Sequence, residues 1–230
     1  MAKLTWHGHS TFSLHTDDGT RIIIDPWLSG NPRADIAAED IEELDFILVT
    51  HGHDDHFADA VELAKRTGAT LVSTFEVATF AREEGKARNV HGMNIGGAHR
   101  FPFGRVKMTI AHHTGTVHGD EHGRYTSTAA GFLVTLNSGT RLYHAGDTAL
   151  TMDMQLLRGQ VDVAILPIGD NYTMGPEDAA KAVEFIEPRV VIPMHYDTMP
   201  LIAQDTEEFR RMIGGRAELR VLQPGGSTDI

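Results

Sequence analysis

The chain has 230 residues, 41% of them hydrophobic, which is enough to bury the core of one large α/β domain. Its formal net charge of -12 repels phosphate backbones, and no run of Lys or Arg offsets that charge locally, so we do not expect nucleic acid as a partner. The absence of cysteine excludes disulfides, thiolate metal ligands and a cysteine nucleophile, so any bound metal needs nitrogen and oxygen ligands.

The sequence contains no membrane-spanning or targeting signal. It has no stretch of about 18 apolar residues, and its first residues run into polar sequence without the apolar core of a signal peptide. We therefore expect a soluble, cytoplasmic protein with no membrane partner. Because no linker or low-complexity segment interrupts the sequence, residues 1–230 are expected to form a single domain.

The first half is predicted to open with a β-hairpin. Apolar segments at 11–14 and 21–24 flank Asp17-Asp18-Gly19, a turn signal. Further elements are expected to alternate: strands at 46–49 and 70–72, and helices at 57–66 and 76–84. Gly68 and Gly85 stand where these helices are expected to stop.

The second half repeats this pattern after residues 114–127, whose glycine, histidine and charge predict an exposed loop. A second hairpin is expected from 131–136 and 140–143, about Asn137-Ser138-Gly139. The later elements are predicted as strands at 161–166 and 190–193 and helices at 176–187 and 206–213. Pro176 and Pro188 mark the ends of the third helix, and Asp205 and Glu208 form a capping-box pattern before the last one.

The two hairpins resemble each other. In each, the second strand begins Gly-Thr-Arg and runs to an aspartate, Asp25 in the first half and Asp147 in the second. This similarity suggests two related halves that face each other. The alternation of strands and helices in both halves predicts a layered α/β architecture.

The segment His51-Gly52-His53-Asp54-Asp55-His56 carries the strongest chemical signal. It follows a predicted buried strand, at the carboxyl edge where functional loops lie. On such a loop His51 and His53 can converge on one ion while Asp55 and His56 turn toward a neighbouring ion. The alternative is an ordinary turn in which Asp54 or Asp55 caps the following helix. Three histidines and two acids within six residues favour the metal site.

This segment resembles the His-x-His-x-Asp-His signature of the metallo-β-lactamase superfamily, and the resemblance extends along essentially the whole chain. It implies a four-layer αββα sandwich with two similar halves, formed by one metallo-β-lactamase-like hydrolase domain over residues 1–230. It also implies two divalent metal ions. We expect zinc, with manganese or iron as alternatives, because the ligands are imidazoles and hard oxygens.

The resemblance also implies the remaining ligands. Asp147, in a Gly-Asp pair at a strand end, corresponds to the bridging carboxylate, and His195 corresponds to the final ligand of the second metal. Strand alternation sends His112 and His113 to opposite faces and leaves the choice between them open. The family's Ala-x-His-Ser/Thr pattern matches Ala111-His112-His113-Thr114 and selects His113. The implied metal sites are His51, His53 and His113 for one ion, and Asp55, His56 and His195 for the other, with Asp147 shared.

Within the superfamily, the chain resembles a group of metal-dependent hydrolases akin to ascorbate-6-phosphate lactonases. The matching segments are His7-Gly8-His9-Ser10, Ile24-Asp25-Pro26-Trp27 and residues 169–176. These segments suggest further residues that line the substrate pocket or orient the metal ligands. His9 lies on a loop that can face the metals, Asp25 is expected to orient a ligand histidine or brace the loop, and Asp170 and Asn171 are expected to border the pocket. His118, Asp120 and His122 are expected to be solvated loop residues.

The activity that the resemblance implies is metal-dependent hydrolysis of a small ester, lactone or phosphoester. A metal-bridging hydroxide would be the nucleophile, and Asp55 or Asp147 would shuttle a proton. Two alternatives remain: a metal-binding sensor or scaffold without turnover, and an iron-dependent oxidoreductase. Diiron flavoproteins of the superfamily typically carry an acid where this sequence has His53. The expected partner is a small-molecule substrate, and a homo-oligomer is left open.

Overall fold

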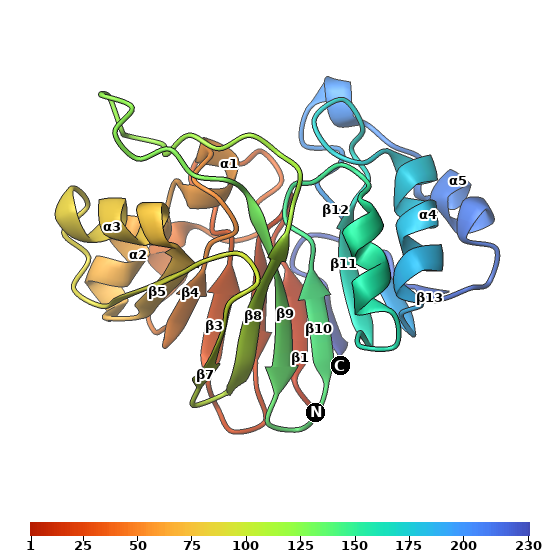
Figure 1. Ribbon diagram of the computed structural model, residues 1–230, viewed down its shortest axis with the longest axis horizontal. Helices are drawn as coiled ribbons and strands as arrows, with labels where there is room; N and C mark the ends of the chain where they lie inside the picture. Colours follow the sequence, from red (N-terminus) through yellow and green to blue (C-terminus); the bar gives the residue numbers. More distant parts are fainter.

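Two mixed β-sheets form the centre of the protein in a computed structural model that describes residues 1–230 (Figure 1). The first sheet contains, in hydrogen-bonded order, β14 (Ser227–Asp229), β1 (Lys3–Trp6), β2 (Phe12–His15), β3 (Arg21–Ile24), β4 (Phe46–Leu48), β5 (Thr70–Thr74) and β6 (Val90–Met93). The second contains β13 (Glu218–Leu219), β12 (Val190–Met194), β11 (Val163–Pro167), β10 (Arg141–His144), β9 (Ala130–Leu136), β8 (Gly104–Ile110) and β7 (Ala98–Phe101).

Helices cover the outer face of each sheet (Figure 1). The first sheet carries α1 (Asp54–Phe57), α2 (Ala60–Thr67) and α3 (Phe75–Glu83), and the second carries α4 (Pro176–Ile186) and α5 (Thr206–Ile213). Three short 3₁₀ turns occupy Ala38–Asp40, Met152–Leu157 and Pro200–Ile202. The expected four-layer αββα sandwich is thereby confirmed. None of the helices combines the length and the apolar character needed to cross a membrane.

The side chains of the parallel strands are apolar on both faces. Ile22 and Ile24 of β3 point into a core of 44 buried residues, which fills the space between the sheets and extends beneath α4 and α5. Ile23, between them, points into a second core of 17 buried residues beneath α1, α2 and α3. This is the alternation of a β-strand, and it explains why the strands read as continuous apolar runs in the sequence.

The two halves repeat one arrangement, as the paired hairpins predict. In the first sheet, β2 and β3 are antiparallel and β3 and β4 are parallel. In the second, β9 and β10 are antiparallel and β10 and β11 are parallel. Asp25 follows β3, and Asp147 follows β10. The carboxyl ends of both sets of parallel strands therefore meet at the edge of the sandwich where the metal-ligand candidates lie.

The predicted hairpin over 11–14 and 21–24 is present as β2 and β3, but it does not open the protein. The strand β1 precedes that hairpin and pairs with β2 on one side and with β14, near the end of the chain, on the other. The three residues of β14 are all polar and give no apolar signal, and the place of this strand depends on contacts distant in sequence. The edge strands β6, β7 and β13 were not predicted, because they also lack a run of apolar residues.

The predicted helix over 57–66 is present as α2 from Ala60 onward, but its start differs, because Phe57 belongs to α1 and residues 58 and 59 separate the two helices. Asp59 stands at the break, where its Oδ2 accepts hydrogen bonds from the backbone N–H groups of Leu28 (2.6 Å) and Ser29 (2.9 Å). Tertiary contacts therefore decide where the helix is interrupted. At the other helix ends, Gly68 adopts the predicted left-handed cap, whereas α3 is capped at Glu84, one residue before Gly85.

Candidate metal centre

The seven predicted ligands come from four separate segments and meet at one edge of the sandwich. They are His51 and His53 after β4, Asp55 and His56 in α1, His113 after β8, Asp147 after β10 and His195 after β12. Several residues at this edge have a positive φ without being glycine: His9 at 54°, Asp25 at 47° and His195 at 56°. Such backbone conformations cost about 1–3 kcal/mol each and gather at functional sites.

Three histidines form the first candidate metal site. The Nε2 atom of His51 lies 2.9 Å from Nδ1 of His53, which in turn lies 3.3 Å from Nε2 of His113. All three ligand atoms lie within 4.8 Å of one another. Burial holds the pKa of His51 well below its usual value, so this imidazole is neutral and keeps a lone pair for a metal. The structure therefore brings His113 to the site, while His112 is exposed.

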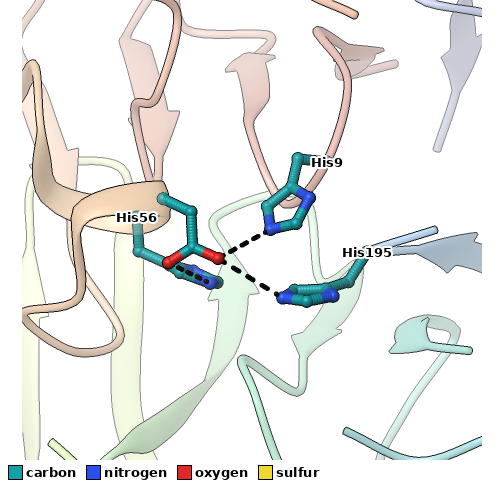
Figure 2. Close-up of side chains that lie close together, drawn as sticks. His9, His56 and His195 are labelled. Atoms are coloured by element: carbon teal, nitrogen blue, oxygen red, sulfur yellow. Dashed lines mark hydrogen bonds and ion pairs between the residues drawn. The ribbon is translucent and has the colours of Figure 1, made fainter. Parts of the chain in front are cut away.

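A second candidate site has four possible ligands: His9, Asp55, His56 and His195. Figure 2 shows the three imidazoles pointing toward one another from different segments of the chain. The Oδ2 atom of Asp55 lies 3.1 Å from Nε2 of His9 and 3.7 Å from Nε2 of His195. From the sequence, His9 was expected to lie on a loop that can face the metals. Its position beside Asp55 depends on how the loop after β1 folds.

Asp147 lies between the two sites and is only 2% exposed. Its Oδ1 atom is 3.3 Å from Nε2 of His56, and its Oδ2 atom is 3.0 Å from Nε2 of His195. The same Oδ2 atom is 3.6 Å from Nε2 of His113, which belongs to the first site. One carboxylate thus contacts ligands from both sites, which is the geometry that a bridging role requires.

The donor atoms fit bound cations. Nε2 of His56, Oδ1 of Asp147 and both ring nitrogens of His195 are buried and make no hydrogen bond of good geometry, although the two Nε2 atoms lie 3.3 and 3.0 Å from the Asp147 carboxylate. An unpaired buried polar atom costs about 1–3 kcal/mol, and such atoms are rare in folded proteins. Burial lowers the pKa of His195, but Asp147 and Asp55 outweigh it and raise this pKa to about 9. The site therefore attracts positive charge, and divalent metal ions would satisfy the unpaired atoms.

Asp25 holds two of the histidines in orientation. Its Oδ2 atom accepts hydrogen bonds from Nδ1 of His56 (2.8 Å) and from the hydroxyl of Thr50 (2.7 Å). Because the Thr50 hydroxyl donates to Asp25, it accepts from Nδ1 of His51 at 3.0 Å. Both imidazoles therefore carry a proton on Nδ1 and turn their Nε2 atoms toward the site. These contacts are those of an acid that fixes the tautomers of ligand histidines.

Replacing Asp25 with asparagine is expected to weaken metal binding by about 10–100-fold, because an amide has one acceptor oxygen and cannot replace both carboxylate oxygens, of which Oδ1 accepts from the backbone N–H of Thr50 and Oδ2 from the Thr50 hydroxyl and His56. Asp35→Asn is the matched control, because Asp35 accepts from Nδ1 of His7 at 2.8 Å, outside the candidate ligand set. Competition with a chelating dye measures the affinities. Equal affinities of Asp25→Asn, Asp35→Asn and the wild type would show that Asp25 does not position the ligands.

A cavity of about 280 Å³ opens over the two sites. Its lining consists of His53, Asp55, His113, Thr114, Asp147, Tyr172, His195 and Met199. Asp170 and Asn171, which were expected to border the pocket, do not line this cavity, and Tyr172 lines it instead. Asn171 and Asp170 form the turn that carries Tyr172, with φ angles of 37° and 59°. Nothing in the sequence identified Tyr172 or Met199 as cavity residues, because a single apolar side chain on a loop is typical of packing against the core.

The loop at 114–127 lacks helices and strands, as predicted. Of the three residues expected to be solvated there, His118 is exposed and pairs with Asp54, with 3.1 Å between Nδ1 and Oδ1. The base of the loop is not free, since Val117 is buried and the backbone N–H of His118 donates to the carbonyl of Gly52. A Cβ atom at Gly52 would lie 2.7 Å from the carbonyl oxygen of Thr116. Glycine at this position thus lets the loop pack against the metal-ligand segment.

Comparisons with known proteins agree with this geometry. Residues 3–195 match the family described as beta-lactamase superfamily domain. A UPF0173 metal-dependent hydrolase of Bacillus cytotoxicus is 50% identical over 233 residues, which cover 99% of this chain and 100% of that protein. A UPF0173 metal-dependent hydrolase of Heliobacterium modesticaldum is 46% identical over 240 residues, covering 100% of this chain and 98% of that protein. The structure of Igni18, described as a novel metallo hydrolase from the archaeon Ignicoccus hospitalis, superimposes with a TM-score of 0.87 at 35% identity, covering 100% of this chain and 99% of that one.

Proposed function

The chain belongs to the beta-lactamase superfamily domain family, and from this premise we propose that it is a metal-dependent hydrolase of a small ester, lactone or phosphoester. The observation that carries the proposal is Asp147, a buried carboxylate that contacts histidines of two adjacent candidate sites. The open cavity above these sites supports turnover of a substrate over a purely structural role for the metals.

We assign two divalent metal ions to the centre, with zinc expected and manganese or iron as alternatives. The first site takes His51, His53 and His113, the second takes Asp55, His56 and His195 with His9 beside them, and Asp147 is shared. When bound, the metals supply Lewis acidity and lower the pKa of water to near neutrality. Our other predictions are a single domain over residues 1–230, a cytoplasmic location, no nucleic-acid partner, and an oligomeric state left open.

Asp55 is the better placed of the two acids to move a proton. Both acids line the cavity, but the side chain of Asp55 is 29% exposed whereas that of Asp147 is almost completely buried. His9 holds Oδ2 of Asp55 at 3.1 Å, and Nδ1 of His9 is itself fixed at 2.7 Å from the hydroxyl of Thr198. Asp55 is therefore oriented to carry a proton to the leaving group, while Asp147 keeps the two sites together.

The test is metal analysis of the purified protein combined with a substrate panel of esters, lactones, phosphomonoesters and phosphodiesters. We expect bound divalent metal and turnover of at least one class, and we expect His53→Ala to lose this turnover together with about one metal per chain. A metal-loaded protein that turned over no member of the panel, while binding a small ligand tightly and leaving it unchanged, would instead be a sensor or scaffold. Oxygen-dependent oxidation by an iron-loaded protein without hydrolysis would indicate an oxidoreductase.

The neighbouring histidines His112 and His113 provide a matched pair of variants. His113→Ala removes a proposed ligand, so we expect the loss of about one metal per chain and a fall in kcat/KM of roughly a hundredfold or more. His112→Ala leaves the site intact, because the side chain of His112 is exposed and only its backbone N–H bonds to Thr148. Elemental analysis and initial rates distinguish the two. If His112→Ala caused the larger loss, the assignment would be reversed.

A further inference from the structure

From the lining and surroundings of the cavity we infer that the substrate is an uncharged ester or lactone whose apolar group packs against Tyr172 and Met199. This inference rests on the proposed hydrolase function and narrows its substrate class. It separates uncharged carbonyl substrates from those with an anionic group away from the reacting bond, such as a sugar phosphate or a half-ester of a diacid.

The first support is the absence of lysine and arginine side chains from the cavity. Its eight lining residues include no Lys or Arg. The imidazoles that line it, His53, His113 and His195, point their nitrogens at the metal-ligand carboxylates and at one another. A remote phosphate or carboxylate group would need Arg or Lys side chains to replace its lost hydration. No such partner is present, so an anionic group remote from the metals would be bound without compensation.

The second support is the negative charge beside the cavity. The turn that carries Tyr172 lies between the cavity, which Tyr172 lines, and a second hollow of about 340 Å³, which Asp170 lines. That hollow is lined by four acids and no base; the acids are Asp170, Glu177, Asp178 and Glu208. Together with the formal net charge of -12, these carboxylates repel an anionic substrate as it approaches. An uncharged substrate has no such penalty.

The third support is the character of the rim. Tyr172 is 50% exposed and Met199 is 36% exposed, and both line the cavity although they lie on different loops. These loops follow β11 and β12 and are joined by a hydrogen bond from the side chain of Gln204 to the carbonyl of Gly169. A tyrosine ring offers a rigid surface to an apolar group, and a methionine side chain offers a flexible one. The volume of about 280 Å³ is small for a ligand pocket, which favours a small acyl or lactone substrate.

The reaction on such a substrate needs only water as co-reactant. The bond between the carbonyl carbon and the leaving oxygen breaks, and a bond from the carbonyl carbon to the water oxygen forms. One proton of the water passes to the leaving oxygen, so an ester gives an acid and an alcohol, and a lactone gives one hydroxy acid. Asp55, which lines the cavity, is the side chain that carries this proton.

A matched substrate pair tests the inference in the metal-loaded wild type. p-Nitrophenyl butyrate and the mono-p-nitrophenyl ester of succinate have the same reacting bond and acyl length, but only the second ends in a carboxylate. We expect kcat/KM to be about tenfold or more higher for the butyrate ester, because the remote carboxylate has no cationic partner. Equal values, or a preference for the succinate ester or for p-nitrophenyl phosphate, would overturn the inference and leave the hydrolase function standing. Failure to turn over any member of the broader panel would instead overturn the proposed function.

Three variants test the role of the rim. Tyr172→Ala is expected to raise KM for the butyrate ester about fivefold, with kcat within about twofold, whereas Tyr172→Phe keeps the ring and restores KM. Met199→Lys adds the missing cation and should shift the preference toward the succinate ester by about tenfold. Leu201→Ala is the control, because Leu201 is 65% exposed on the same segment but does not line the cavity. If Met199→Lys and Leu201→Ala both kept the wild-type preference, the rim would not select the substrate.

Discussion

Replacing Asp147 with asparagine is expected to lower kcat/KM by about a thousandfold or more, equivalent to roughly 4 kcal/mol of transition-state stabilisation. The amide keeps the shape of the side chain but carries no charge. Its NH₂ group would point at the histidine nitrogens that Asp147 now faces at 3.0 to 3.6 Å. Because one group can no longer serve both sites, the metal content is expected to fall from two ions toward one.

Asp162→Asn is the control for this experiment. Asp162 is a partly buried acid of the same half, but it accepts hydrogen bonds from Arg141, outside the candidate ligand set. Circular dichroism and thermal unfolding establish that both variants are folded before their rates and metal contents are compared. Full metal content and full activity in Asp147→Asn would remove Asp147 from the centre and with it the shared-carboxylate assignment.

Removing the metals with a chelator is expected to abolish hydrolysis and to destabilise the fold. A ligand present at about a thousand times its Kd contributes roughly 4 kcal/mol to the free energy of unfolding. For a chain of this size that corresponds to a decrease in Tm of roughly 8–16 °C. Without cations, the carboxylates and imidazoles of the centre stay buried with unpaired atoms, as at Nε2 of His56 and Oδ1 of Asp147.

Calorimetry with and without chelator measures the shift, and Asp147→Asn serves as the comparison. Because this variant is expected to bind less metal, the chelator should change its Tm by less than it changes the wild-type value. An unchanged Tm together with undiminished activity after exhaustive chelation would exclude a metal-dependent reaction. Recovery of both quantities on adding back a divalent metal separates metal loss from irreversible damage.

Much of the fold could be predicted from the sequence because local patterns and tertiary packing agree there. The alternation of Ile22, Ile23 and Ile24 between two cores explains the apolar run that predicted β3. The repeated hairpins predicted the two similar halves, and α4 begins at Pro176 as its sequence indicates. The prediction was incorrect for the division of 57–66, where the contact of Asp59 with residues 28 and 29 interrupts the helix.

The candidate centre could be predicted to a similar extent. The candidate ligands in the segment 51–56 are close in sequence, so their spacing alone predicts a metal site. The sequence alone could not decide between His112 and His113. Alternation along a strand shows that their side chains lie on opposite faces, but not which face meets the metals. The proximity of His9 to Asp55, and the positions of Tyr172 and Met199 around the cavity, depend on how distant loops meet. No periodicity or spacing encodes such contacts.

The most direct test of a two-metal hydrolase is a titration of divalent metal into the metal-free protein. Bound metal and hydrolysis of the best panel substrate are measured on the same samples. We expect activity to reach its maximum when two ions are bound per chain, and His113→Ala to stop at about one ion with little activity. Maximal activity in the metal-free protein, or binding of two ions without hydrolysis of any substrate class, would contradict a two-metal hydrolase.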